Sequence, residues 1–350
     1  MVSQQQEELP GAEMPIDDPD GQVARQGESG PSESLGSIIA AILANIAVGI
    51  VKFIAAGISG SSAMVSEGIH SIVDSGNGLL LLFGMKRASR KPNIEHPFGY
   101  SHELYFWTLV VAVMIFALGG GFSIYEGLHN LAEIGPDTQL GDPLMSYIVI
   151  GASAIIEAVS LSVALRSFNK ARGDTSPMSF IREAKDPSLF TVVLEDTAAE
   201  TGLIVAFCGV FFSHAFNNPY IDAGASVIIG LLLCIVATIL LRETKGLLVG
   251  EGMHAKDILR IEQIVEADPQ VMECGRILTL YLGPDDVLIT LDATFTEGST
   301  RDDIDLAIDR IERGIVSEYP QTKRIFIENE NIRVTRAASA RIHEQISEGA

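Results

Sequence analysis

Three ionisable residues lie in an otherwise apolar stretch of this 350-residue chain. Glu67, His70 and Asp74 belong to the segment 62–78, which reads SAMVSEGIHSIVDSGNG. Residues three and four apart share one face of a helix, so the three side chains would point the same way. An imidazole and a carboxylate one turn apart can hold a borderline divalent cation. The alternative is a polar row that joins two helices by hydrogen bonds.

A second group of acids interrupts the apolar segment 189–212. Asp196 and Glu200 are four residues apart and share a face, whereas Glu195 points about 100° away from Asp196. A carboxylate in hydrocarbon is unfavourable unless it is paired, protonated or bound to a metal. If both segments face one cavity, His70, Asp74, Asp196 and one further acid would form a four-ligand site. Such a site suits zinc, cobalt, manganese or ferrous iron; the alternative is a set of protonated acids bonded to neighbouring helices.

Three more polar residues lie in apolar segments and have simpler interpretations. Lys52 is expected to reach the membrane interface or to pair with an acid. Glu157 is either a proton-coupled group or a paired interior acid. Asp222 is expected to cap the helix that begins at residue 221.

These residues belong to a chain with six long apolar segments. Each is close to the roughly 20 residues that a helix needs to cross the hydrocarbon core. The segments cover residues 38–58, 63–83, 104–125, 144–165, 189–212 and 221–241. The sequence therefore predicts an α-helical membrane protein with six transmembrane helices.

The charges divide the chain into four parts. The formal net charge is −21, and residues 1–36 and 251–350 carry most of it. We expect a disordered acidic tail (1–35), a transmembrane domain (36–246), a small cytoplasmic domain (247–333) and a C-terminal tail (334–350). The acidic balance argues against nucleic acid as a partner.

Basic residues occur only in alternate connections between the apolar segments. The connections after the second, fourth and sixth segments are basic, and those between them contain no Lys or Arg. The positive-inside rule then places both termini in the cytoplasm. We expect a multi-pass protein of the bacterial inner membrane.

The pattern changes after Gly250 to that of a small α+β domain. Residues 257–267 and 300–317 have helical spacing, and residues 276–282, 287–295 and 324–328 are predicted strands. The order α-β-β-α-β fits a small sheet with both helices on one face.

Two motifs give this chain a family resemblance. An acid before His70-Ser-x-x-Asp74, and the run HPFGYSHE at 96–103, resemble the cation diffusion facilitator family over about residues 36–330. The resemblance implies a homodimeric, proton-coupled exporter of divalent metal with a ferredoxin-like cytoplasmic domain. It makes His70 and Asp74 metal ligands of the second helix.

The fifth helix departs from the common family pattern. Where that pattern has His-x-x-x-Asp, this chain has Val192 followed by Asp196. The stretch VVLEDTAA is similar to a subgroup with Glu-Asp at this point, related to mitochondrial and nuclear-associated zinc transporters. Glu195 and Glu200 are both candidates for the fourth ligand, and Glu67 is a secondary candidate.

The expected function is transport, not enzymatic catalysis. The chain would export divalent transition-metal cations from the cytosol in exchange for protons, by alternating access. Zinc is expected first, with manganese, iron, cobalt or cadmium as alternatives, and with no permanently bound cofactor. The expected partners are metal ions, protons, the lipid bilayer and a second copy of the chain. Rival hypotheses are a membrane metal sensor and an intramembrane metallohydrolase.

Overall fold

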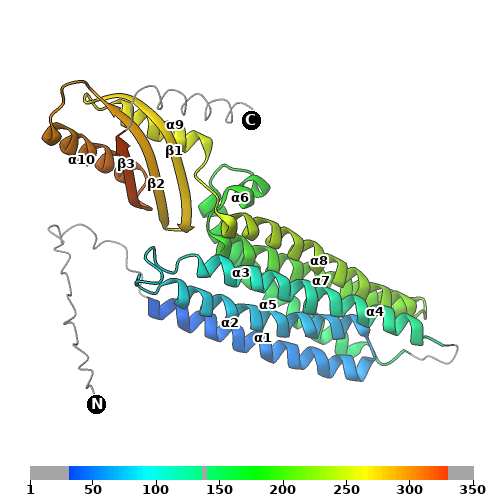
Figure 1. Ribbon diagram of the computed structural model, residues 1–350. Coiled ribbons are helices and arrows are strands. Elements are labelled where there is room, and N and C mark those ends of the chain that lie inside the picture. Colours follow the sequence, from blue (N-terminus) through cyan, green and yellow to red (C-terminus); the bar gives the residue numbers. More distant parts are fainter. Residues whose placement is uncertain (1–30, 136–139, 330–350) are drawn as a thin grey trace, which may run out of the picture. The chain divides into compact units, whose positions relative to one another are not determined.

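The computed structural model describes residues 31–135 and 140–329 (Figure 1). The predicted C-terminal tail and most of the predicted N-terminal tail lie outside these ranges. The helical part contains α1 (Pro31–Ser59), α2 (Ser62–Ala88), α3 (Glu103–Met114), η1 (Ile115–Gly121), α4 (Phe122–Glu133), α5 (Leu144–Arg172), α6 (Pro177–Glu183), α7 (Pro187–Ala215) and α8 (Tyr220–Val249). Helix α1 therefore begins inside the segment that we expected to be a disordered tail.

Four stretches of the described chain are long and apolar enough to cross a membrane. They are Glu103–Glu133, Leu144–Arg172, Phe190–Ala215 and Tyr220–Val249. In α1 the apolar stretch is the shorter Asn45–Ser59. Helix α2 carries the polar row found in the sequence, which lowers its mean hydropathy. A helical membrane domain is thus confirmed, while two of its six predicted spans stay predictions.

The third span is a continuous helix with a wider segment in its middle. Residues 115–121 form the π-helix η1, which contains three consecutive glycines and joins α3 to α4. A Cβ atom on Gly230 of α8 would lie 2.8 Å from the carbonyl oxygen of Gly120. Glycine is therefore needed here for the close approach of α8 to this segment. The apolar pattern had predicted a helix over residues 104–125, whereas the helix continues to Glu133.

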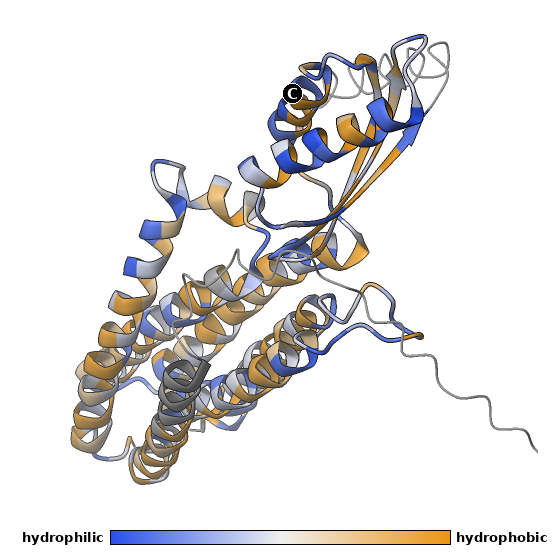
Figure 2. Cartoon of the chain, turned by 90° about the vertical axis from the view of Figure 1, so that its left-hand side faces the viewer, coloured by the Kyte–Doolittle hydropathy of each residue, from blue (hydrophilic) through white to orange (hydrophobic). Residues whose placement is uncertain are grey.

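The hydrophobic core of the helical part lies where α2, α3, α5, α7 and α8 pack together. Its fully buried members include Met64, Ile115, Phe190, Leu203 and Ile229. Many large apolar side chains on the same helices are exposed, for example Ile155 and Val159 of α5. Figure 2 shows hydrophobic residues along the whole length of these helices. This distribution suits a helix bundle that faces lipid.

The small domain follows the predicted order α-β-β-α-β. It consists of α9 (Ala255–Glu266), β1 (Val271–Gly283), β2 (Asp286–Phe295), α10 (Arg301–Glu318) and β3 (Thr322–Asn329). Strands β1 and β2 are antiparallel, and β2 and β3 are parallel, in the order β1-β2-β3.

Both helices of the small domain contribute to one hydrophobic core. Ile261 of α9 and Ile311 of α10 pack in the same cluster as Ile289 and Leu291 of β2. Arg310 of α10 donates two hydrogen bonds to Asp268, at 2.7 and 2.9 Å, and lowers the pKa of that carboxyl group. The core and this ion pair together hold the helices on the sheet.

Helix α10 begins with a capping box. The Thr300 hydroxyl accepts a hydrogen bond from the Asp303 amide at 3.3 Å, and the Asp303 carboxylate accepts one from the Thr300 amide at 3.0 Å. Thr300 is therefore the N-cap residue of the helix that the spacing of residues 300–317 predicted. Two otherwise unsatisfied backbone donors are paired in this way.

Thr300→Ala should loosen the first turn of α10, because it removes the side chain that caps the helix. The loss of an N-cap costs about 1 kcal/mol, which corresponds to roughly fivefold faster local opening. Hydrogen exchange of peptides from residues 300–318, measured by mass spectrometry on the full chain, should show this acceleration. Thr300→Ser keeps the cap and should exchange at the parental rate. Equal exchange in Thr300→Ala and the parent would contradict the assignment.

Candidate metal site

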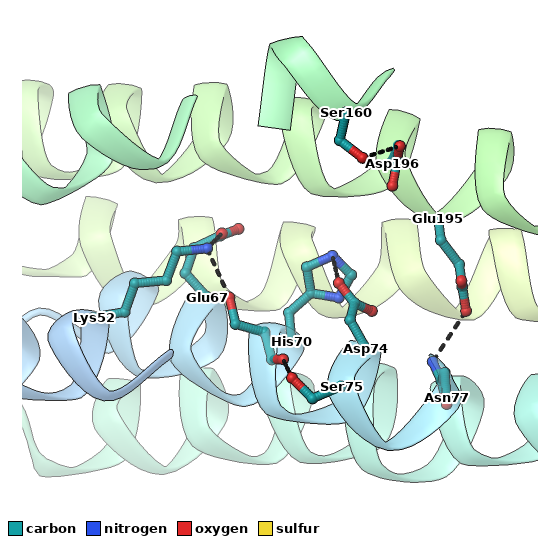
Figure 3. A network of polar contacts seen from close by, with 10 residues as sticks. Lys52, Glu67, His70, Asp74, Ser75, Asn77, Ser160, Glu195 and Asp196 are labelled. Atoms are coloured by element: carbon teal, nitrogen blue, oxygen red, sulfur yellow. Dashed lines mark hydrogen bonds and ion pairs between the residues drawn. The ribbon is translucent and has the colours of Figure 1, made fainter. Parts of the chain in front are cut away.

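The candidate site lies between α2 and α7, with α1 and α5 beside them. Figure 3 shows His70 and Asp74 turned toward each other on α2, one helical turn apart. His70 Nε2 lies 3.4 Å from Asp74 Oδ2, and the two side chains are 3% and 13% exposed. The helical spacing that predicted this pair is therefore confirmed.

The acids of α7 point in two directions. Asp196 accepts a hydrogen bond from Ser160 Oγ of α5 at 2.9 Å, whereas Glu195 accepts one from Asn77 Nδ2 of α2 at 3.0 Å (Figure 3). Glu195 is rotated about 100° from Asp196 around the axis of α7, as the sequence predicted. It thereby reaches α2, the helix that carries His70 and Asp74. Val192 lies one turn before Asp196 and is 38% exposed.

Several buried polar atoms of this region have no hydrogen-bond partner. They include both ring nitrogens of His70, Oδ1 of Asp74 and Oε2 of Glu200. Buried polar atoms are normally paired, because an unpaired group loses its hydration without compensation. Nitrogen and oxygen atoms of this kind are the ligands that borderline divalent cations accept.

The site residues do not form a complete coordination sphere. Among the described residues, no three His, Cys, Asp or Glu side chains are close enough together to hold a metal ion. His70 and Asp74 are adjacent, while Asp196 and Glu195 are held by Ser160 and Asn77. A shared site therefore requires the α7 carboxylates to come closer to His70 and Asp74, and each of them has a second oxygen that its hydrogen bond does not use.

Glu67 has a partner that the sequence analysis did not assign to it. Its Oε2 atom lies 3.0 Å from Lys52 Nζ of α1, and neither side chain is exposed to solvent. Lys52 therefore pairs with an acid, one of its two expected roles. Ser71, one residue after His70, accepts a second hydrogen bond from the same ammonium group at 3.0 Å.

Asp222 stabilises a different helix from the one predicted. Its carboxylate accepts hydrogen bonds from Ser61 Oγ and from the Ser62 amide, both at 2.7 Å. The expectation that Asp222 caps its own helix was wrong, because the neighbouring α2 presents its free amides to this carboxylate. This contact fixes the start of α2 against α8, two turns before His70.

Glu157 of α5 is buried, with 7% of its surface exposed. Its charge interacts with those of Lys52, Asp74, His70 and Asp196. Glu157 therefore borders the same region as the candidate ligands, although sequence spacing alone could not connect α5 with α2. Its polarity in an apolar segment was the only signal.

Gly202 of α7 lies directly against the Glu67 carboxylate. A Cβ atom at this position would be 2.5 Å from Glu67 Oε1, inside van der Waals contact. Glycine at position 202 thus permits α7 to approach the polar face of α2.

Gly202→Ala should destabilise the protein by about 1–3 kcal/mol, because the added methyl group overpacks against the Glu67 carboxylate, which its buried ion pair with Lys52 holds in place, and this cost outweighs the gain in helix propensity. Gly224→Ala is the matched control, since nothing lies within 4 Å of a Cβ atom there. In that control, alanine should be neutral or stabilising by up to about 1 kcal/mol, through its higher helix propensity. The thermal midpoints of the full chains in detergent micelles test this. Equal midpoints for the two variants would contradict the packing described here.

Comparisons with known proteins find relatives of the helical part of this chain. Residues 38–249 match the family model described as the cation efflux transmembrane domain. The chain is 32% identical over 259 residues to metal tolerance protein C4 of Arabidopsis thaliana, covering 73% of this chain and 56% of that protein. It is 33% identical over 235 residues to the mouse mitochondrial proton-coupled zinc antiporter SLC30A9, covering 66% and 41%.

A more distant relative is bacterial. The manganese efflux system protein MneS of Bacillus subtilis is 22% identical over 261 residues, covering 74% of this chain and 80% of that protein. The chain spans about half the length of the plant and mouse relatives.

Proposed function

Since the chain belongs to the cation diffusion facilitator family, whose members are transporters and not enzymes, we propose that it exports divalent transition-metal cations from the cytosol in exchange for protons. The observation that supports this proposal most is the buried pair of His70 and Asp74 on α2, where His70 Nδ1 and Asp74 Oδ1 have no hydrogen-bond partner. Family membership removes the metallohydrolase hypothesis. The sensor hypothesis is less well supported, because it gives no reason for ligand-type residues within the membrane domain.

The proposed substrate site contains His70, Asp74 and Asp196, with Glu195 or Glu200 as the fourth ligand. One imidazole nitrogen and several carboxylate oxygens suit zinc, and they also accept manganese or ferrous iron. Glu195 is the better-supported fourth ligand, since its hydrogen bond to Asn77 already directs it toward α2. Glu67 is paired with Lys52 and is not included.

The transported ion would reorganise the site. Entry of the cation next to His70 and Asp74 would draw the carboxylates of Asp196 and Glu195 toward it, which pulls α7 toward α2. The bound ion thus favours one arrangement of the helices over another, as alternating access requires. Metal and protons compete for the same nitrogen and oxygen atoms, so protonation from the opposite side releases the metal.

The proposal also covers the membrane orientation, the substrate and the oligomeric state. The chain is a multi-pass membrane protein, and the basic connections support cytoplasmic termini. The plant and mouse relatives carry names that refer to metal tolerance and to a mitochondrial zinc antiporter, and the bacterial one to manganese efflux. Zinc is the proposed first substrate. A homodimer with a ferredoxin-like cytoplasmic domain, and a bacterial inner membrane, stay predictions.

Asp74→Asn and Asp196→Asn should each reduce zinc uptake into proteoliposomes at least a hundredfold, because each removes a charged ligand while preserving side-chain size. Asp174→Asn, which changes an exposed acid outside the site, is the matched control and should transport at the parental rate. Initial rates are measured with a zinc-sensitive dye inside the vesicles. Parental rates in either site variant would remove that residue from the substrate site.

Zinc movement should depend on the pH gradient, because the ligands exchange metal for protons. At a membrane potential clamped to zero, an acidic vesicle lumen should drive zinc inward through molecules whose cytoplasmic face is outside. Reversing the pH gradient should reverse the net flux. The measurement follows zinc and internal pH together. A flux that ignores the pH gradient would replace antiport with facilitated diffusion.

A further inference from the structure

The most completely buried charges of the described chain are those of Lys52 and Glu67. Lys52 Nζ of α1 contacts Glu67 Oε2 and Ser71 Oγ of α2, both at 3.0 Å. Both charged side chains have an exposed fraction of 0%. A pair of this kind could be purely structural, since an apolar pair of similar size often gives equal or greater stability. Its position suggests more than a structural role.

Glu67 occupies a position from which it could serve as a metal ligand. It precedes His70 by three residues and Asp74 by seven, so all three carboxylate or imidazole groups lie on one face of α2. Its second oxygen, Oε1, has no hydrogen-bond partner and faces α7 at Gly202. Helix α7 also carries Glu195 and Asp196. Glu67 thus lies beside the proposed substrate site. Lys52 holds its Oε2 atom, whereas its Oε1 atom has no hydrogen-bond partner.

The ammonium group of Lys52 provides that restraint. It also donates a hydrogen bond to Ser71, the residue next to His70, so the ammonium group lies beside the His70–Asp74 end of the site. A tethered cation bound to Glu67 prevents that carboxylate from approaching a divalent ion. It also repels the ion from this end of the site, toward His70 and Asp74.

We propose that Lys52 is a specificity-determining residue, which withholds Glu67 from the ligand set and thereby favours zinc over harder cations such as manganese. The inference rests on the function proposed above. Each additional carboxylate oxygen among the metal ligands favours a harder cation such as manganese. With fewer oxygen ligands, the His70 nitrogen contributes a larger share of the binding, which favours zinc. Lys52 acts through Glu67 and does not itself contact the metal.

The test compares Lys52→Met in two backgrounds, with Glu67 present and with Glu67→Gln. Zinc and manganese dissociation constants are measured on the full chain in detergent micelles, by indicator competition for zinc and electron paramagnetic resonance for manganese. The readout is the manganese-over-zinc preference, defined as the zinc constant divided by the manganese constant. Lys52→Met should raise this preference at least fivefold when Glu67 is present. In the Glu67→Gln background it should change the preference less than twofold.

Gly49→Ala is the control for altered packing between α1 and α2. Its Cβ atom would meet Ile72 and Ser71 at 3.1–3.3 Å without changing any charge. It should leave the preference within twofold of the parent. A preference that Lys52→Met does not change, or changes equally in both backgrounds, would overturn the inference. A purely structural role predicts that result, since it affects stability but not the choice of ion.

If Lys52→Met does not fold, the double variant Lys52→Met/Glu67→Gln decides. It removes both charges without freeing a carboxylate, so its preference should stay within twofold of the parent. A change of fivefold or more would show that Glu67 already coordinates the ion, and would overturn the inference. A parent that binds neither ion would instead overturn the proposed function.

Discussion

The low dielectric of a membrane interior is the constraint on which this structure depends. An ionised side chain there must have a partner, because water is not present to stabilise its charge. Helix α2 nevertheless carries Glu67, His70 and Asp74 along one face. Two solutions occur on this one face. Glu67 is neutralised by Lys52, and Asp74 lies 3.4 Å from the ring of His70 on the same helix.

Three neighbouring helices make polar contacts with α2. Asp222 of α8 holds the start of α2, and Lys52 of α1 holds its middle. Glu195 of α7 bonds to Asn77, nearly three turns after Glu67. Helix α2 is therefore attached by directional polar contacts to three neighbours, where apolar packing alone would allow sliding in lipid. These contacts hold the polar face of α2 at a defined position along its neighbours.

Much of the fold could be predicted from sequence, because hydrophobic periodicity and length specify helices directly. The order α-β-β-α-β and the Thr300 cap are local patterns of this type. The pair His70–Asp74 was also predictable, since both residues belong to one helix. Lys52–Glu67 and Asp222–Ser62 were not, because they join separate helices whose relative rotation leaves no trace in spacing. The short helix α6 was missed because its seven residues show too little periodicity.

The π-helix η1 has a consequence for insertions and deletions in this chain. Its backbone hydrogen bonds enclose one more residue than those of an α-helix, so residues 115–121 contain slack that α3 and α4 do not. Removing one residue from this segment would restore ordinary α-helical winding and leave α3 and α4 on their present faces. The same deletion in the middle of α8 would rotate every later residue of that helix by about 100°. Among the described helices of the membrane domain, η1 is therefore the segment where a one-residue deletion would change the direction of later side chains least.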